Sequence, residues 1–248
     1  MSFPYQAIFF DLSGVLYQGT KVIAGAVSAI KKARSLNLTL RFLTNTASKP
    51  SHIILHDLAK MGIDIKADEL FTAPIAARKY LEQHDLRPYC LIHSAIKTDF
   101  AHINQTQPNC VLLGDAGDDL NYQTLNVAFQ LCHQGAPLVA IGMNKYYQSD
   151  DGLVLDAGAF VKAVSWAADR EPIIMGKPDK SFYQQVVAST PFTASQCLMV
   201  GDDVESDVCG ALNAGLNACL VQTGKFQDKD LAKLPKGATV IKSVADLF

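Results

Sequence analysis

The chain has 248 residues, 49% of them hydrophobic and 19% charged, which is the balance of a globular protein with a sizeable core. Its formal net charge is −2, from 22 basic and 24 acidic residues that are interspersed along the sequence. Because no long basic block is present, duplex nucleic acid is not an expected partner. A small anionic substrate needs only one or two well-placed cations and stays open.

Cysteine usage and hydropathy predict a cytoplasmic protein with no membrane partner. None of the six cysteines forms a Cys-x-x-Cys pair, and most lie in apolar stretches, which indicates reduced and buried thiols. No apolar stretch reaches the ~20 residues that a membrane span requires, and the N-terminus leads directly into a strand pattern. The six dispersed histidines indicate surface or packing positions, and Trp166 is expected to pack in an interior.

Strand and helix patterns alternate along the chain. Short apolar runs predict buried strands, and apolar residues at helical spacing predict helices. Repeated units of this size favour parallel strands with right-handed crossovers, hence an α/β fold with a doubly wound sheet. In chain order, we expect strand 7–10, helix 25–36, strand 39–43, helix 51–61, strands 90–93 and 110–113, helix 122–132, strand 138–141, a hairpin or long loop over 145–155, strand 173–175, helix 181–189, strand 197–200, helix 205–214 and strand 218–221.

Four of these predicted strands border on small polar or charged residues. Each such segment alone is a common turn or helix-cap pattern, but four in one chain are hard to explain by turn chemistry. Because the carboxyl ends of parallel strands face one crevice, the side chains can meet although most of the chain separates them. The segments are Asp11-Leu12-Ser13-Gly14, Thr44-Asn45-Thr46, Gly176-Lys177-Pro178 and Gly201-Asp202-Asp203.

The residue types in these segments predict a phosphoryl-transfer site. Asp11 and Asp202, with Ser13 or its carbonyl nearby, form a partial shell of oxygen ligands, which suits Mg²⁺. No His or Cys stands at these positions to favour zinc. A carboxylate at such a site can attack phosphorus and form an aspartyl-phosphate. Phosphate oxygens would meet two neutral donors and one cation, which are Thr44, Asn45 and Lys177.

The four segments resemble the motifs of the haloacid dehalogenase (HAD) superfamily of phosphohydrolases. The first motif, Asp-x-Asp-Gly-Thr/Val, is matched by residues 11–15 except at its third place, where Ser13 stands. The second and third are matched by Thr44 with Asn45 and by Lys177, and the fourth, Gly-Asp-Asp-x-x-x-Asp, by residues 201–207. The Thr-Asn and Gly-Lys-Pro forms are similar to subfamily IIA, whose large cap lies between motifs two and three. Likeness to members that also carry serine extends to Arg87-Pro88-Tyr89 and Lys145-Tyr146-Tyr147.

This resemblance, which covers essentially the whole chain, implies a Rossmann-like HAD core over 1–72 and 173–248. An inserted α/β cap of the C2 type would span 73–172, exclude bulk water and select a small phosphorylated substrate. A homodimer through the cap is a further hypothesis. In place of the Asn-Pro-Asp of many capped members stands Gly142-Met143-Asn144. Candidates for the substrate side are Lys145, Tyr146, Tyr147 and the Asp156-Ala157-Gly158 turn.

The resemblance also implies a role for each site residue. Asp11 would be the nucleophile and a Mg²⁺ ligand, Ser13 would give its backbone carbonyl to the metal, and Asp202 would be the second carboxylate ligand. Three further residues would hold the transferring phosphoryl group, and two acids in the fourth motif would orient ligands or waters. The first three are Thr44, Asn45 and Lys177, and the other two are Asp203 and Asp207.

Ser13 is expected to restrict which bonds the enzyme breaks. In the family, the acid at this place protonates the leaving group and then activates water, which is worth about 10²–10⁴-fold in rate. Serine cannot do either near neutral pH, so the hypothesis is a slow enzyme that favours phosphoramidates, pyrophosphate or activated phosphates. One alternative is a phosphatase of broad specificity for sugar or nucleotide phosphates. Another is a non-catalytic phosphate-binding protein, against which the retained Asp11, Lys177 and Asp202 argue.

Overall fold

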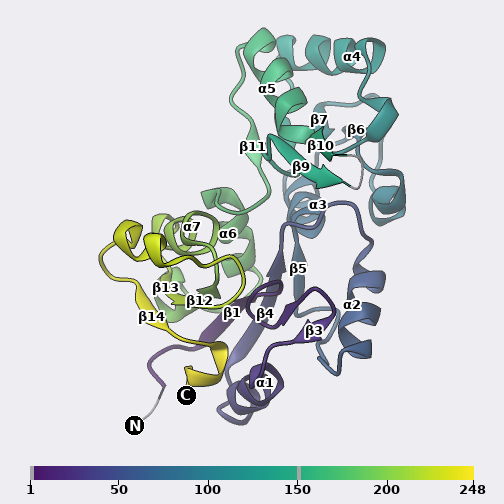
Figure 1. Ribbon diagram of the computed structural model, residues 1–248. Helices are drawn as coiled ribbons and strands as arrows, with labels where there is room; N and C mark the ends of the chain where they lie inside the picture. The colour runs from purple at the N-terminus through teal and green to yellow at the C-terminus, as the bar shows by residue number, and fades with distance from the viewer. Residues whose placement is uncertain (1–2, 150–151) are drawn as a thin grey trace. The chain divides into compact units, whose positions relative to one another are not determined.

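The computed structural model describes residues 3–149 and 152–248, which divide into two compact units (Figure 1). The first unit takes in the residues up to 44 together with 51–71 and 177–248. The second takes in residues 45–50 and 72–176. The assignment of the first unit as a catalytic core and of the second as a cap remains a prediction.

The first unit is built on a six-stranded sheet in the order β14-β13-β12-β1-β4-β5 (Figure 1). The pairings of β1 with β12 and β4, and of β13 with β12 and β14, are parallel. Every residue of β1 is buried, because its apolar run carries no polar alternation and suits a strand covered on both faces. The strands are β1 (Ala7–Asp11), β4 (Thr39–Thr44), β5 (Leu70–Thr72), β12 (Cys197–Gly201), β13 (Asn217–Val221) and β14 (Thr239–Ile241), and a small ribbon is formed by β2 (Tyr17–Gln18) and β3 (Lys21–Val22).

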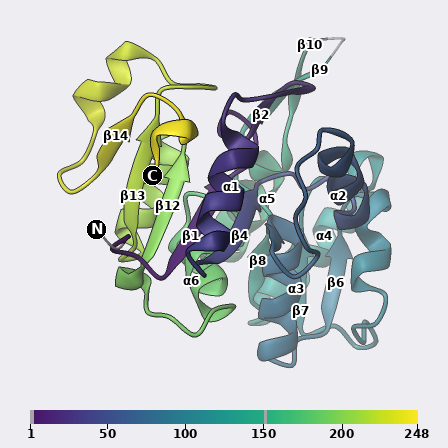
Figure 2. The same ribbon diagram turned by 90° about the horizontal axis from the view of Figure 1, so that it is seen from below.

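Strand order explains why helices cover both faces of this sheet. The chain moves outward from β1 to β4 in one direction and from β12 to β13 in the other. Right-handed crossovers in opposite directions place their helices on opposite faces, and α1 indeed lies opposite α6 and α7 (Figures 1 and 2). The predicted helix 205–214 is split into a π-helical turn (Val204–Cys209) and α7. The helices are α1 (Ala26–Ser35), α2 (Ser51–Lys60), α6 (Lys180–Ala188) and α7 (Gly210–Asn213).

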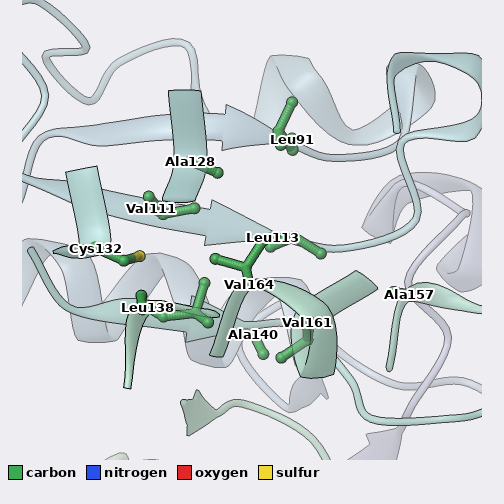
Figure 3. Close-up of a cluster of buried hydrophobic side chains, with 11 residues drawn as sticks. Leu91, Val111, Leu113, Ala128, Cys132, Leu138, Ala140, Ala157, Val161 and Val164 are labelled. Atoms are coloured by element: carbon green, nitrogen blue, oxygen red, sulfur yellow. The ribbon is translucent and has the colours of Figure 1, made fainter. Parts of the chain in front are cut away.

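The second unit has a parallel sheet of its own, in the order β11-β8-β7-β6. Side chains of β7 and β8 point toward those of α4 and α5 and form a buried apolar cluster, in which Val111 and Leu138 lie near Cys132, and Ala140 lies near Val161 (Figure 3). An antiparallel hairpin, β9 with β10, occupies the segment predicted as a hairpin or loop. The elements are α3 (Ala73–Gln83), β6 (Pro88–Leu91), β7 (Cys110–Leu113), α4 (Tyr122–His133), β8 (Leu138–Ala140), β9 (Tyr146–Ser149), β10 (Gly152–Leu155), α5 (Ala157–Ala168) and β11 (Ile173–Ile174).

Two aromatic residues of this unit do not pack as predicted. Trp166 was expected in an interior but is 82% exposed. Helix α5 buries Val161, Val164 and Ala168, and a residue two places from Val164 falls on the opposite side of a helix with 3.6 residues per turn. In the predicted helix 122–132, now α4, the helical spacing of Tyr122, Leu125, Phe129 and Cys132 predicts a stripe packed in the core, yet Tyr122 is 80% exposed. For α4, the helix was therefore predicted correctly, but the extent of its buried side was overestimated.

All six cysteines are free thiols, and four of them are buried. Burial raises the pKa of Cys90 and of Cys110 to about 12 each, and that of Cys132 to about 11. Within the part of the chain that the structure describes, no helix combines the length and the apolar character needed to cross a bilayer.

Candidate active site

Three buried charged side chains form an ion-pair cluster in the first unit. Lys177 Nζ donates hydrogen bonds to Asp11 Oδ1 at 2.5 Å and to Asp207 Oδ1 at 2.6 Å. The exposed fractions are 8% for Asp11, 9% for Lys177 and 1% for Asp207. Charges are rarely buried to this degree unless they are paired or serve a function, so this cluster is a candidate catalytic site.

Sheet register brings the two predicted carboxylates together. Asp11 is the last residue of β1, and Asp202 directly follows β12. Since Phe10 is paired with Val200 in parallel register, both acids emerge at the same edge of the sheet. The side chain of Asp202 is also buried, with 3% exposure. The predicted meeting of strand ends is thus seen for these two residues.

Asp207 organises the loop that follows β12. Its Oδ2 accepts hydrogen bonds from the backbone amides of Asp202 and Asp203, both at 3.2 Å. A Cβ on Gly201 would lie 2.2 Å from the Cβ of Asp207, so glycine is required where the end of β12 approaches the π-helical turn. Asp203 caps the π-helical turn by accepting from the amides of Glu205 and Ser206 at 3.0 and 2.9 Å. The two carboxylates therefore fix the backbone of the loop and turn that follow β12, and Asp207 is also a member of the charged cluster.

With Asp202 included, the charged cluster comprises Asp11, Lys177, Asp202 and Asp207, and its acids fit a divalent cation with oxygen ligands. Asp11, Asp202 and Asp207 each offer one carboxylate oxygen, and these three oxygens lie within 4.8 Å of one another. An all-oxygen set without nitrogen or sulfur donors suits Mg²⁺ better than zinc. Asp207 was predicted to orient ligands or waters; both of its oxygens accept hydrogen bonds, and its carboxylate also lies within reach of the other two acids.

Burial controls the electrostatics of the cluster. It raises the pKa of Asp11 from 3.8 to about 7, with Lys177 opposing the shift and the carboxylates of Asp207 and Asp202 adding to it. Burial would lower the pKa of Lys177, but Asp11 and Asp207 outweigh it and raise this pKa above its usual value. Burial likewise raises the pKa of Asp202, and the backbone amide of Lys225 opposes this shift. The lysine is therefore protonated near neutral pH, and its charge opposes the rise that burial causes in the pKa of Asp11 and of Asp202.

The remaining predicted site residues lie in different surroundings. Ser13 is exposed in the loop after β1. Thr44 ends β4 and is half-buried, while Asn45 is the first residue of the segment that groups with the second unit. The side chains of Tyr146 and Tyr147 lie outside the described part of the structure, and Lys145 is exposed.

The second unit has a hollow of about 430 Å³, in which the predicted Asp156-Ala157 turn takes part. Asp156 is the N-cap of α5, and its Oδ1 accepts from the amide of Ala157 at 2.6 Å. His93 and Asp115 also line the hollow. Its lining therefore combines polar side chains with a helix N-terminus, within the second unit alone.

One contact of the cluster was not predicted from the sequence. The backbone amide of Lys225, in the loop after β13, donates to Asp202 Oδ2 at 2.7 Å. The available signal was the polar Gln222-Thr223-Gly224-Lys225 run directly after the predicted strand 218–221. It is the same pattern of a buried strand followed by small polar residues that marked the other strand ends.

Two family models match the chain over most of its length. One, described as a haloacid dehalogenase-like hydrolase, matches residues 8–106, and the other, described as HAD-hydrolase-like, matches residues 174–247. The matched segments contain Asp11, Lys177 and Asp202. The charged cluster thus lies in the parts of the chain that carry the family signal.

Named relatives align with more than nine-tenths of the chain. The haloacid dehalogenase-like hydrolase domain-containing protein 2 from Bos taurus is 39% identical over 229 residues, which are 92% of this chain and 88% of that protein. The human phospholysine phosphohistidine inorganic pyrophosphate phosphatase is 36% identical over 231 residues, 91% and 86% of the two chains. A 4-nitrophenylphosphatase from Thermotoga maritima has a similar structure, with a TM-score of 0.84, 25% identity and coverage of 98% and 96%. The chain therefore belongs to the haloacid dehalogenase-like hydrolases and is an enzyme of the phosphatase kind.

Proposed function

We propose that this protein is a Mg²⁺-dependent phosphohydrolase that works through an aspartyl-phosphate on Asp11. The observation that carries the proposal is the buried Asp11 carboxylate, hydrogen-bonded to Lys177 at 2.5 Å and grouped with Asp202 and Asp207. A nucleophile, a fixed cation and an oxygen-only metal shell at one point are the parts that phosphoryl transfer needs. The relatives named as phosphatases support the same conclusion.

In the proposed reaction, a carboxylate oxygen of Asp11 attacks the phosphorus of the substrate. The bond between phosphorus and the leaving group breaks, and the leaving group departs with the electron pair. Water then attacks the acyl phosphate, which releases inorganic phosphate and restores the carboxylate. Lys177 neutralises phosphoryl charge throughout, since its raised pKa keeps it protonated.

Other residues would position the phosphoryl group and the metal. Thr44 and Asn45 would donate hydrogen bonds to phosphoryl oxygens. Asp11, Asp202 and the carbonyl of Ser13 would hold Mg²⁺, and Asp207 stands close enough to take part or to orient a ligated water. When bound, Mg²⁺ supplies charge neutralisation at the phosphoryl oxygens.

The serine at position 13 favours substrates whose leaving groups need no proton from the enzyme. Imidazole leaving from phosphohistidine has a pKa near ~6.5. Phosphate leaving from pyrophosphate titrates near ~6. An alkoxide from a sugar phosphate is a far poorer leaving group. Phosphoramidates, pyrophosphate and activated esters are therefore the proposed substrate class, and one relative is named for phospholysine, phosphohistidine and pyrophosphate.

A substrate panel tests this preference. Pyrophosphate and imidodiphosphate should be hydrolysed faster than glucose 6-phosphate, measured as phosphate released at saturating Mg²⁺. In Ser13→Asp, turnover of the sugar phosphate should rise by about 10²–10⁴-fold, the usual value of a placed acid. Ser94→Asp, at an exposed position of the second unit, is the matched control and should change nothing. Wild-type hydrolysis of glucose 6-phosphate that is orders of magnitude faster than that of pyrophosphate would refute the leaving-group argument.

The two alternatives are separated by simpler measurements. A phosphatase of broad specificity for sugar or nucleotide phosphates would show its highest kcat/KM on those esters in the same panel. A non-catalytic phosphate-binding protein would bind phosphate but show no Mg²⁺-dependent hydrolysis of p-nitrophenyl phosphate. Hydrolysis that is lost in Asp11→Asn would exclude the binding protein.

Two predictions concern the setting of the enzyme. The six free cysteines support a reducing compartment such as the cytoplasm. A homodimer through the second unit would be measured by light scattering after gel filtration. The exposed Tyr122 and Trp166 on α4 and α5 are the side chains to replace in that test.

A further inference from the structure

The loop after β13 contacts the Asp202 carboxylate from a side that the family motifs do not cover. The backbone amide of Lys225 donates to Asp202 Oδ2 at 2.7 Å. The side chain of Lys225 is 73% exposed and its Nζ lies 3.7 Å from Asp203 Oδ2, so only the backbone amide of Lys225 donates to the buried acid. One oxygen of the carboxylate is thereby fixed by the backbone.

Two glycines enclose the same oxygen. A Cβ on Gly14 would lie 2.0 Å from Asp202 Oδ2, and a Cβ on Gly224 would lie 2.1 Å from it. Both residues are in the left-handed region, with φ values of +91° and +65°. No side chain could be placed at either position without displacing the carboxylate.

A side-chain hydrogen bond ties the two glycine loops together. Thr223 Oγ1 donates to the carbonyl of Gly14 at 2.5 Å, across 209 positions of sequence. Gly14 lies three residues after Asp11, in the loop that follows β1. The Thr223 hydroxyl therefore links the loop that follows Asp11 to the loop whose Lys225 amide donates to Asp202.

We propose that Thr223, Gly224 and the Lys225 amide are a positioning element for the metal ligand Asp202. By holding Oδ2, the element leaves Oδ1 for the metal and removes rotational freedom that metal binding would otherwise have to remove. The inference rests on the proposed Mg²⁺ site. Outer partners of this kind typically contribute about 10–100-fold to metal affinity.

Isothermal titration calorimetry with Mg²⁺ on the full chain tests the element without using turnover. Thr223→Val keeps the shape of the side chain and removes its hydroxyl, so the Kd for Mg²⁺ should rise by about tenfold or more. Thr223→Ser keeps the hydroxyl and should restore the wild-type Kd. Gly224→Ala should give the largest increase. Its matched control is Gly62→Ala, at a φ of +77° where a Cβ would meet no atom within 4 Å, and its Kd should not change.

The outcomes separate this element from the metal site itself. A wild-type Kd in Thr223→Val and Gly224→Ala overturns the positioning role and leaves the Mg²⁺ site standing. Equal losses in Gly224→Ala and Gly62→Ala show general backbone strain and also overturn it. A wild-type protein that binds no Mg²⁺ overturns the site and the element together. Thermal unfolding establishes that each variant is folded, and Thr223→Ala replaces the valine variant if valine disturbs folding.

Discussion

Both units carry polar residues where parallel strands end, but the two sets differ in burial and pairing. In the first unit, Asp11 at the end of β1 is 8% exposed and hydrogen-bonded to Lys177. In the second unit, Asp115 follows β7 in a half-exposed position, and its Oδ1 accepts from the amide of Gly117 at 3.2 Å. The latter is an ordinary Asx turn. Both acids follow the end of a parallel strand, and burial with a counter-charge distinguishes Asp11, the proposed nucleophile, from Asp115.

The largest difference between the two units is expected in turnover. Asp11→Asn removes the proposed nucleophile, so kcat for p-nitrophenyl phosphate should fall by roughly 10³–10⁶-fold, as for nucleophiles in other enzymes. Asp115→Asn makes the same chemical change at a strand end of the second unit and should alter kcat by less than about tenfold. Steady-state kinetics at saturating Mg²⁺ measure both variants. Equal losses would mean that burial and pairing do not mark the catalytic strand end.

The second difference is expected in stability. Lys177→Met leaves Asp11 and Asp207 buried without their cation, which should lower the free energy of unfolding by about 3–5 kcal/mol. Lys97 forms an exposed pair with Asp119 at 3.1 Å in the second unit, and Lys97→Met should cost no more than about 1 kcal/mol. Urea unfolding of the metal-free protein compares them. Similar costs for the two lysines would contradict the view that the buried cluster holds its charges by mutual pairing.

A smaller effect is expected from pH. Burial raises the pKa of Asp11 to about 7 in the folded protein, against 3.8 without it. The folded state therefore binds this proton more tightly than the unfolded state, and the stabilisation is complete below about pH 4 and lost as the pH rises through 7. Mg²⁺ competes for the same carboxylate, so its Kd should increase as the pH falls below 7, by up to about tenfold per pH unit.

Thermal unfolding and Mg²⁺ titration between pH 5 and 8 check this expectation. Asp11→Asn should lose both dependences, whereas Asp118→Asn, at an exposed position of the second unit, should keep them. A metal-free wild-type protein that becomes more stable between pH 5 and 7 to the same extent as Asp11→Asn would contradict the raised pKa.

The smallest effect is expected at the surface of the second unit. Trp166 is 82% exposed, so Trp166→Ser should change the free energy of unfolding by no more than about 0.5 kcal/mol. Val164→Ala, two residues away on the buried side of α5, should cost about 1–3 kcal/mol by comparison. Chemical denaturation of the two variants measures the contrast. A large cost for Trp166→Ser would indicate that a partner or a second copy covers this face.

Much of the fold could be predicted because its strands are short apolar runs bounded by polar residues. The run Cys110–Leu113 was placed with the observed bounds, and Ala7–Phe10 was one residue short. Helix α5 was not predicted, since its Ala-rich sequence carries a weak pattern and its largest aromatic side chain, Trp166, is exposed to solvent. The π-helical turn at Val204–Cys209 could not be distinguished from the start of an α-helix, because the two share their apolar positions.

For the candidate site, the sequence predicted which residues take part better than it predicted the contacts between them. Asp11, Lys177 and Asp202 were identified from strand ends and from family resemblance, and the structure brings their charges into one buried cluster. That Lys177 bridges Asp11 and Asp207 could not be predicted, because side-chain pairing depends on how the loop after β12 turns. The role of Thr223 was missed for the same reason, since its partner is a backbone carbonyl far away in sequence.

The state of the cysteines has a practical consequence for labelling. Thiolates are the species that react with maleimides and iodoacetamide, and burial raises the pKa of the Cys90, Cys110 and Cys132 thiols to about 11–12. Burial also raises the pKa of the Cys197, Cys209 and Cys219 thiols, so the native chain should react slowly with such reagents while it is folded. A single cysteine introduced at an exposed position could then carry a fluorophore without first removing the natural ones.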